Sequence, residues 1–264
     1  MFSLRDISAQ YKQTVLGPVW FVLQPLLATF VFSFIFGRFA FGGEAQDGVA
    51  QTPHFLFYMS GLIVWGFFAD CANKTSNTFT KNSALFGKVY FPRLAVPIAQ
   101  TLTNLIAFSV QFTVFLFGLC YYFAKREWFG DPLHPIHLDP NWRICLMPLI
   151  LLMVGMLGLG VGLVVSALST RYRDLAMATG FGLQLWMYGS SVAFPISAIK
   201  DPFAVKLLTL NPMVPLIEAT RLAFLGKGTV TLAQFTTSGA VCLCVFIFGV
   251  MMFNRAEQDV MDSV

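Results

Sequence analysis

The chain has 264 residues, of which 56% are hydrophobic and only 11% are charged, and its mean hydropathy is +0.70. This composition excludes an ordinary soluble domain, in which about a quarter of the residues are charged. The formal net charge of +4 is too small to indicate a nucleic-acid partner. The sequence therefore indicates a membrane protein.

The first predicted element is an amphipathic helix over residues 3–17. Its apolar residues recur at spacings of three and four and so share one helical face: Leu4, Ile7, Tyr11, Val15 and Val19. Ser3 and Asp6 have the spacing of a capping box, and Gly17 is followed by a proline. We expect this helix to lie on the inner surface of the membrane.

Six apolar stretches follow the start of the chain. Five uncharged runs have 25, 31, 27, 25 and 27 residues, and each exceeds the roughly 20 residues that cross a bilayer as a helix. A sixth stretch is shorter because Asp70 interrupts it. We predict transmembrane helices at about 18–37, 55–73, 95–123, 144–168, 175–193 and 233–254.

Basic residues predict the orientation of these helices. The segment between the second and third spans carries four Lys and Arg and no acid, and the short turn after the fourth span contains Arg171 and Arg173. Short cytoplasmic loops are enriched in Lys and Arg. Both chain termini are therefore predicted to face the cytoplasm.

The segment 194–228 is too apolar for an ordinary loop and too broken for a span. Four prolines divide it, at positions 195, 202, 212 and 215, and proline interrupts a helix. We expect two short re-entrant helices here. Because irregular backbone at membrane depth must be buried in protein or line a cavity, this segment is a candidate gate.

Motifs for catalysis and nucleotide binding are absent from the sequence. It has no G-x-x-x-x-G-K-[ST] phosphate loop and no H-E-x-x-H zinc motif. His134 and His137, with Asp131 and Asp139, have metal-ligand chemistry, but prolines on both sides break helical spacing, so we predict no metal site. Asp70 is the clear ionisable residue inside a predicted span.

Two further patterns concern packing and recognition. Gly158, Gly162 and Ser166 form a row of small residues, which lets helices approach closely, either within the chain or in a second copy. Four aromatic residues with polar edges lie within spans and could stack against sugars along a substrate path: Tyr58, Trp65, Trp186 and Tyr188.

Four segments together resemble a known family. They are residues 5–27 (RDISAQYKQTVLGPVWFVLQPLL), 81–98 (KNSALFGKVYFPRLAVPI), 170–175 (TRYRDL) and 210–226 (LNPMVPLIEATRLAFLG). The combination resembles the membrane permeases of bacterial ABC exporters for surface polysaccharide, which export O-antigen, capsule or teichoic acid. The resemblance runs over almost the full chain, although the family usually carries some extra residues ahead of the Arg-Asp pair.

The resemblance implies an all-α integral membrane protein with six spans, an N-terminal interface helix and short re-entrant helices before the last span. It implies a homodimer in the cytoplasmic (inner) membrane. ATP and Mg²⁺ would be held by a separate ABC ATPase subunit, and this chain would bind no cofactor. The chain would then be a transport permease, which is not itself an enzyme.

The resemblance also assigns roles to residues. Coupling to the ATPase would occur in the loop 81–93, with support from the N-terminal helix and the turn at 171–174: Arg5, Asp6, Tyr11, Lys12, Lys81, Phe86, Lys88, Tyr90, Phe91, Arg93, Arg171, Arg173 and Asp174. The gate would include Phe194, Pro195, Asn211, Pro212 and Arg221.

The expected function is export of a lipid-linked surface polysaccharide such as O-antigen, as a step of lipopolysaccharide biosynthesis. Two alternatives stay open. One is a permease of the same architecture that exports a drug or a lipid. The other is a membrane-embedded enzyme acting on lipid-linked sugars, with Asp70 or the Asp131, His134, His137 and Asp139 group as catalytic residues.

Overall fold

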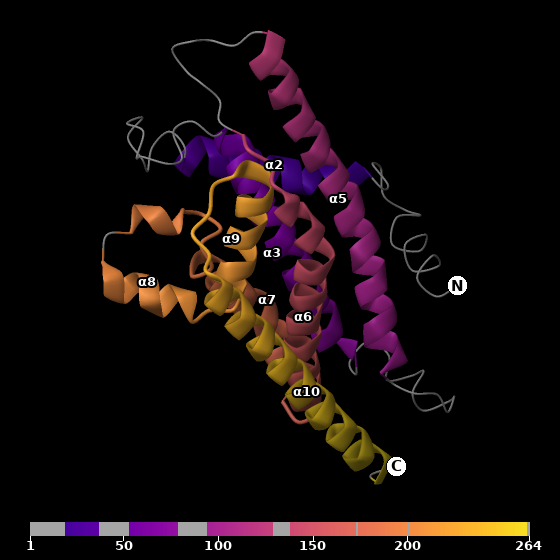
Figure 1. Cartoon of the computed structure of the whole chain (residues 1–264). Helices are drawn as coiled ribbons and strands as arrows, with labels where there is room; N and C mark the ends of the chain where they lie inside the picture. Colours follow the sequence, from indigo (N-terminus) through magenta and orange to yellow (C-terminus); the bar gives the residue numbers. More distant parts are fainter. Residues whose placement is uncertain are drawn as a thin grey trace.

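The computed structural model is built from α-helices and short 3-10 helices (Figure 1). It describes residues 19–36, 53–78, 94–128, 138–172, 174–199 and 201–262, and these residues contain no β-strand. The architecture is thus all-helical, as predicted. The predicted interface helix at 3–17 and the predicted coupling loop at 81–93 lie outside the described residues.

Each predicted span contains one long or medium-length helix. The elements in chain order are α2 (Trp20–Ile35), α3 (His54–Ser76), α5 (Ala95–Trp128), η3 (Trp142–Leu146), α6 (Met147–Ser169), α7 (Asp174–Tyr188), η4 (Ile196–Ala198), α8 (Pro202–Thr209), α9 (Met213–Leu225) and α10 (Leu232–Asp262).

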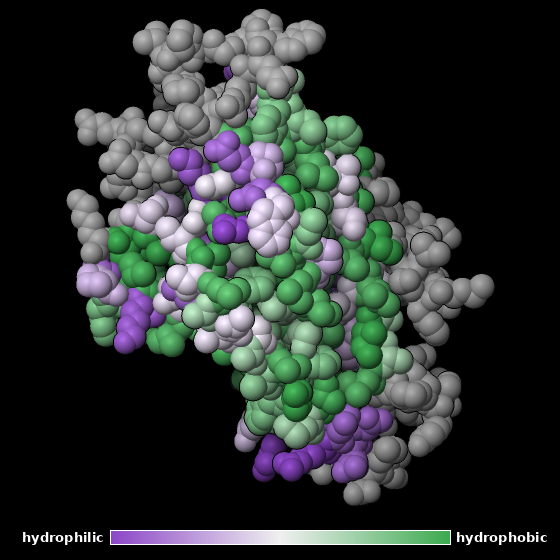
Figure 2. Space-filling model, in the orientation of Figure 1, coloured by the Kyte–Doolittle hydropathy of each residue, from purple (hydrophilic) through white to green (hydrophobic). Residues whose placement is uncertain are grey.

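Four helices of the described chain are long and apolar enough to cross a membrane: α3, α5, α6 together with η3, and α10. The 16-residue α2 and the 15-residue α7 are shorter, about 24 and 22 Å at 1.5 Å per residue. In the view of Figure 1, α2 runs across α3 and α5. Figure 2 shows a broad hydrophobic band between hydrophilic regions near the upper end of α9 and at the lower end of α10.

The helix α7 ends earlier than the predicted span 175–193. Gly189 and Ser190 form a turn after Tyr188, and Ser191 has a φ of 52°. A non-glycine residue with positive φ cannot continue a right-handed helix. The last predicted turn of this span is therefore an irregular linker at 189–195, whose carbonyl groups are free to accept hydrogen bonds from elsewhere.

The helix α6 packs between α3 and α10 through glycines on two faces. A Cβ atom built on Gly158 would lie 2.7 Å from Cβ of Cys71 in α3, and one on Gly162 would lie 2.5 Å from Cβ of Thr75. On the other face, a Cβ on Gly160 would lie 2.8 Å from Cα of Phe246 in α10. The small-residue row predicted from the sequence thus serves contacts within the chain.

Replacing Gly162 by Ala tests this close packing. Alanine favours a helix over glycine by about 1 kcal/mol, but here the added methyl group meets Thr75 and the carbonyl oxygen of Ala72. We expect the free energy of unfolding to fall by about 1–3 kcal/mol, the usual range for overpacking. Thermal unfolding of the purified protein in detergent measures the change.

Gly182 in α7 provides the matched control, because nothing lies within 4 Å of a Cβ built there. Gly182→Ala should leave the melting temperature unchanged or raise it. Equal effects of the two substitutions would contradict the packing argument.

Candidate functional site

A buried charged side chain lies at the centre of the predicted gate. Arg221 belongs to α9, of whose residues only Leu222 is not buried, and its own side chain has no exposed surface. Removing a guanidinium from water is costly unless other groups replace the lost hydrogen bonds. The groups that bond to Arg221 therefore constrain the position of α9.

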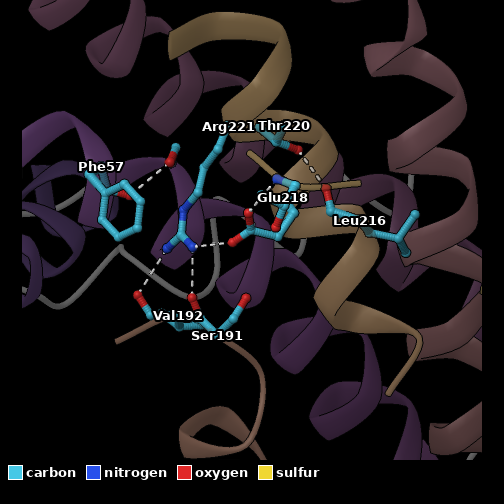
Figure 3. Close-up of polar contacts among 9 residues, drawn as sticks. Phe57, Ser191, Val192, Leu216, Glu218, Thr220 and Arg221 are labelled. Atoms are coloured by element: carbon cyan, nitrogen blue, oxygen red, sulfur yellow. Dashed lines mark hydrogen bonds and ion pairs between the residues drawn. The ribbon is translucent and has the colours of Figure 1, made fainter. Parts of the chain in front are cut away.

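The guanidinium of Arg221 joins three elements (Figure 3). Its Nη1 donates to the carboxylate of Glu218 at 2.9 Å and to the backbone carbonyl of Ser191 at 2.8 Å, and its Nη2 donates to the carbonyl of Val192 at 3.1 Å. Its Cζ lies 3.7 Å from the ring centroid of Phe57 in α3, a cation–π contact. Gly61 of α3 leaves room for the guanidinium, because a Cβ atom built there would lie 2.9 Å from Nη2.

Asn211 holds the linker 189–195 from its other side. Its Nδ2 donates to the carbonyl of Gly189 at 3.0 Å and to the hydroxyl of Ser190 at 2.9 Å. Its Oδ1 accepts from the backbone N–H of Met213, which begins α9. The linker is thus bound to α9 at two points, one before the helix and one within it.

Glu218 extends the network to the segment that precedes α10. Its Oε2 accepts from the backbone N–H of Thr229 at 3.3 Å while Oε1 pairs with Arg221. The connection before η3 is attached as well, because the N–H of Asn141 donates to the carbonyl of Ala223 at 3.0 Å. We call Glu218, Arg221 and the backbone groups bonded to them the gate network.

The structure brings the predicted gate residues together around this network. Asn211 and Arg221 make the bonds described above, Pro195 is buried in the linker, and Phe194 is half-buried beside it. Pro212 occupies the N-cap position of α9. Glu218 was missed, although it is the only acid between Asp201 and Glu257 and stands three residues before Arg221, a spacing that places the two on one helical face.

The four predicted path aromatics differ in exposure. Tyr58 is 1% exposed and packs against Phe32 and Phe36 of α2, whereas Tyr188 is 50% exposed at the end of α7. Trp65 is buried, with its ring centroid 6.3 Å from that of half-buried Trp186. Trp186 also lines an apolar groove of about 360 Å³ between α6 and α7.

Of the predicted coupling residues, Arg171 and Asp174 are described, and both are exposed at the turn between α6 and α7. The others lie outside the described residues: Arg5, Asp6, Tyr11, Lys12, Lys81, Phe86, Lys88, Tyr90, Phe91, Arg93 and Arg173. Leu94, which directly follows the predicted coupling loop, packs against a cluster formed by Leu163 of α6 and Phe253 of α10.

Asp70 lies in α3 with an exposed side chain. One turn later, Lys74 donates to Oδ1 of Asn104 in α5 at 2.5 Å, and Nδ2 of the same asparagine lies 3.6 Å from Sγ of Cys71. These bonds join α3 and α5. The predicted metal and catalytic candidates Asp131, His134 and His137 are outside the described residues, and Asp139 is exposed.

Together these features define a helical membrane protein in which the short helix α9 is anchored by a buried ionic network. The chain belongs to the ABC-2 type transporter family, whose model matches residues 2–225. It is thus a member of a transporter family, and the comparison extends over most of the chain.

Individual relatives match over nearly their whole length. The chain is 27% identical to the O-antigen export system permease protein RfbA of Myxococcus xanthus, over 98% of this chain and 92% of the relative. It is 24% identical to the protein of the same name from Klebsiella pneumoniae, over 96% and 89%. It is 20% identical to the polysialic acid transport protein KpsM of Escherichia coli, over 98% and 93%.

Substituting Arg221 by Met should destabilise the protein by about 3–5 kcal/mol, because it leaves the carboxylate of Glu218 buried without its counter-charge. Arg221→Lys should recover only part of the loss, since one ammonium cannot reproduce the planar fork that reaches Glu218, Ser191 and Val192. Thermal unfolding in detergent measures both.

The double variant Glu218→Gln with Arg221→Met separates the ion pair from the rest of the network. The double variant should lose less free energy of unfolding than the two single variants lose together, because neither charge is then left unpaired. Lys206→Met, at an exposed position of α8, is the control and should change little. Strict additivity would show that the two charges do not interact.

Proposed function

We propose that this chain is the membrane permease of an exporter that moves a lipid-linked surface polysaccharide, such as O-antigen, across the cytoplasmic membrane. The observation that carries the proposal is the end-to-end match with relatives named for O-antigen export and polysialic acid transport. Membership of the ABC-2 type transporter family supports it. The energy comes from a separate ATPase subunit, which holds ATP and Mg²⁺.

In this proposal α2, α3, α5, α6, α7 and α10 are the six spans, and α8 and α9 are the re-entrant helices of the gate. The short α2 and α7 cross the membrane where the bilayer is locally thinned or with the help of flanking segments. The irregular backbone at 190–193 is buried, and this supports its placement at membrane depth, where such backbone must be covered by protein or line a cavity. Both termini face the cytoplasm, and two copies enclose the path.

Coupling to the ATPase takes place at the end of the molecule where α5 and α7 begin and α6 ends. Exposed Arg171 and Asp174 lie at this end, and Leu94, the residue after the loop 81–93, packs against α6 and α10. A charged rim around apolar anchors such as Phe86 and Tyr90 suits a protein partner. Force applied here reaches the gate through α6 and α10.

The glycan is proposed to pass along the exposed side of α7. Trp186 borders the groove between α6 and α7, and half-exposed Tyr188 lies two residues later, at the end of α7. Weak, repeated stacking on such rings would hold a long hydrated polymer without trapping it. Trp65 supports Trp186 from the interior, where the two rings are in contact, whereas buried Tyr58 packs against Phe32 and Phe36 of α2.

Copurification tests the partnership. A tagged chain should bring down a second polypeptide that contains a phosphate loop, and the double substitution Lys88→Glu with Arg93→Glu should lower its yield at least about tenfold, since opposed like charges cost several kcal/mol at an interface. Lys206→Glu on α8 is the control and should retain the ATPase. If the double variant recovers as much ATPase as the wild type, the coupling site does not include Lys88 and Arg93.

Export of glycan tests the path. Tyr188→Ala should lower the export rate about two- to tenfold, because one aromatic contact contributes roughly 0.5–1.5 kcal/mol, whereas Tyr188→Phe should preserve it. The measurement is the appearance of surface glycan in cells that lack the native permease. Tyr121→Ala, an exposed tyrosine of α5, is the control. Full export by Tyr188→Ala would remove this residue from the path.

A further inference from the structure

A second cavity is lined by residues of α8, of α9 and of the segment before α10. Its volume is about 450 Å³, which falls within the roughly 300–1,000 Å³ of small-molecule sites. Five segments contribute to its lining, which comprises Arg143, Ile196, Val205, Thr209, Leu222, Gly228, Thr229, Val230, Thr231 and Gln234. Neither the gate network nor the proposed glycan path uses these side chains.

The lining combines one cation with hydroxyl and amide groups. Arg143 is its only charged residue, and among the described residues no carboxylate forms an ion pair with it. The nearby carboxylate of Glu218 is already neutralised by Arg221, although it reaches the backbone of Thr229. The cavity therefore has a net positive charge and favours an anion.

Several hydrogen-bond donors in the cavity remain available. The backbone N–H groups of Thr231 and Gln234 satisfy each other's side-chain oxygens in a capping box, and the hydroxyl of Thr209 donates to the carbonyl of Lys206. Within the described part of the chain, the guanidinium of Arg143, the Nε2 of Gln234 and the hydroxyl of Thr229 donate to no other group. These donors suit oxygen atoms that carry negative charge.

The helix α8 forms one wall of this cavity. Val205 and Thr209, one turn apart, face the cavity, whereas Phe203, Leu207 and Leu210 are between 60% and 73% exposed. Trp142, next to Arg143, is 73% exposed, and tryptophan is typical of the level of lipid headgroups. The outer side of α8 thus offers an apolar surface to lipid tails, directly beside a cationic cavity.

We propose that this cavity binds the phosphate of an anionic phospholipid, with Arg143 as the principal ligand and the acyl chains lying along the exposed face of α8. A guanidinium forms paired hydrogen bonds with phosphate oxygens. The apolar floor formed by Leu222 and Val230 accommodates the glycerol end of the headgroup. The inference requires only a membrane protein and does not depend on the cargo that the chain exports.

Native mass spectrometry of the purified full-length chain in detergent tests the proposal. Phosphatidylglycerol, titrated into delipidated protein, should bind at low molar excess, and phosphatidylcholine should bind at least about tenfold more weakly. Arg143→Gln should weaken phosphatidylglycerol binding about tenfold or more, since it removes the charge-assisted hydrogen bonds to the phosphate. Arg143→Lys should retain part of the binding, and Arg171→Gln, at an exposed turn, is the control.

A second variant tests the cavity without removing its cation. Val205→Glu, on the face of α8 that lines the cavity, introduces a negative charge and should also weaken phosphatidylglycerol binding about tenfold. Both variants should elute as folded protein with the wild-type melting temperature in lipid-free detergent. If Arg143→Gln does not fold, the binding of phosphatidylglycerol to Val205→Glu tests the site.

Competition identifies the source of the phosphate. Inorganic phosphate at millimolar concentration should fail to displace the lipid, because it gains nothing from the apolar face of α8. Complete displacement would overturn the assignment to a lipid and indicate a soluble anion. Equal binding of phosphatidylglycerol to wild type and to both variants would overturn the site itself.

Discussion

The arrangement of α9 and of the linker 189–195 depends on one buried guanidinium. Arg221 has no exposed surface, and its hydrogen bonds go to α9 itself, through Glu218, and to two carbonyls of the linker that follows α7. A buried charge is tolerated only while its partners are all in place. The linker, α9 and the start of α3 must therefore move together or exchange the whole set of bonds at once.

The packing of α6 supplies the rigid frame for this network. Glycines on opposite faces let α3 and α10 approach α6 so closely that a single methyl group would clash. The helix α7 is attached differently: only three of its residues are buried, and a Cβ built on Gly180 or Gly182 would meet nothing within 4 Å. The helices α3, α6 and α10 thus form a tightly packed core, and α7 is loosely attached to it. The linker that bonds to Arg221 follows α7.

Length and charge patterns predicted the helices of this protein because a membrane imposes continuous uncharged runs. The row of small residues in α6 could also be predicted from the sequence, but the helices that it packs against could not. The gate network was only half predicted. Glu218 and Arg221 stand in a proline-divided segment between two predicted spans, and their burial depends on Phe57 and Gly61, which lie about 160 residues earlier in the chain. Local patterns carry no signal for such a distant contact. The early end of α7 was missed for the same reason, since its linker is held by Asn211 and Arg221.

One short segment connects the gate network to the cationic cavity. The backbone N–H of Thr229 donates to Glu218, while Gly228, Thr229 and Val230 line the cavity that contains Arg143. A Cβ on Gly228 would lie 2.5 Å from the carbonyl oxygen of Glu218, so this segment cannot shift toward α9. Any displacement of residues 228–230 by an occupant of the cavity must therefore alter the hydrogen bonds of Glu218 and, through it, those of Arg221. The two sites share a structural element, and occupancy of one is expected to bias the geometry of the other.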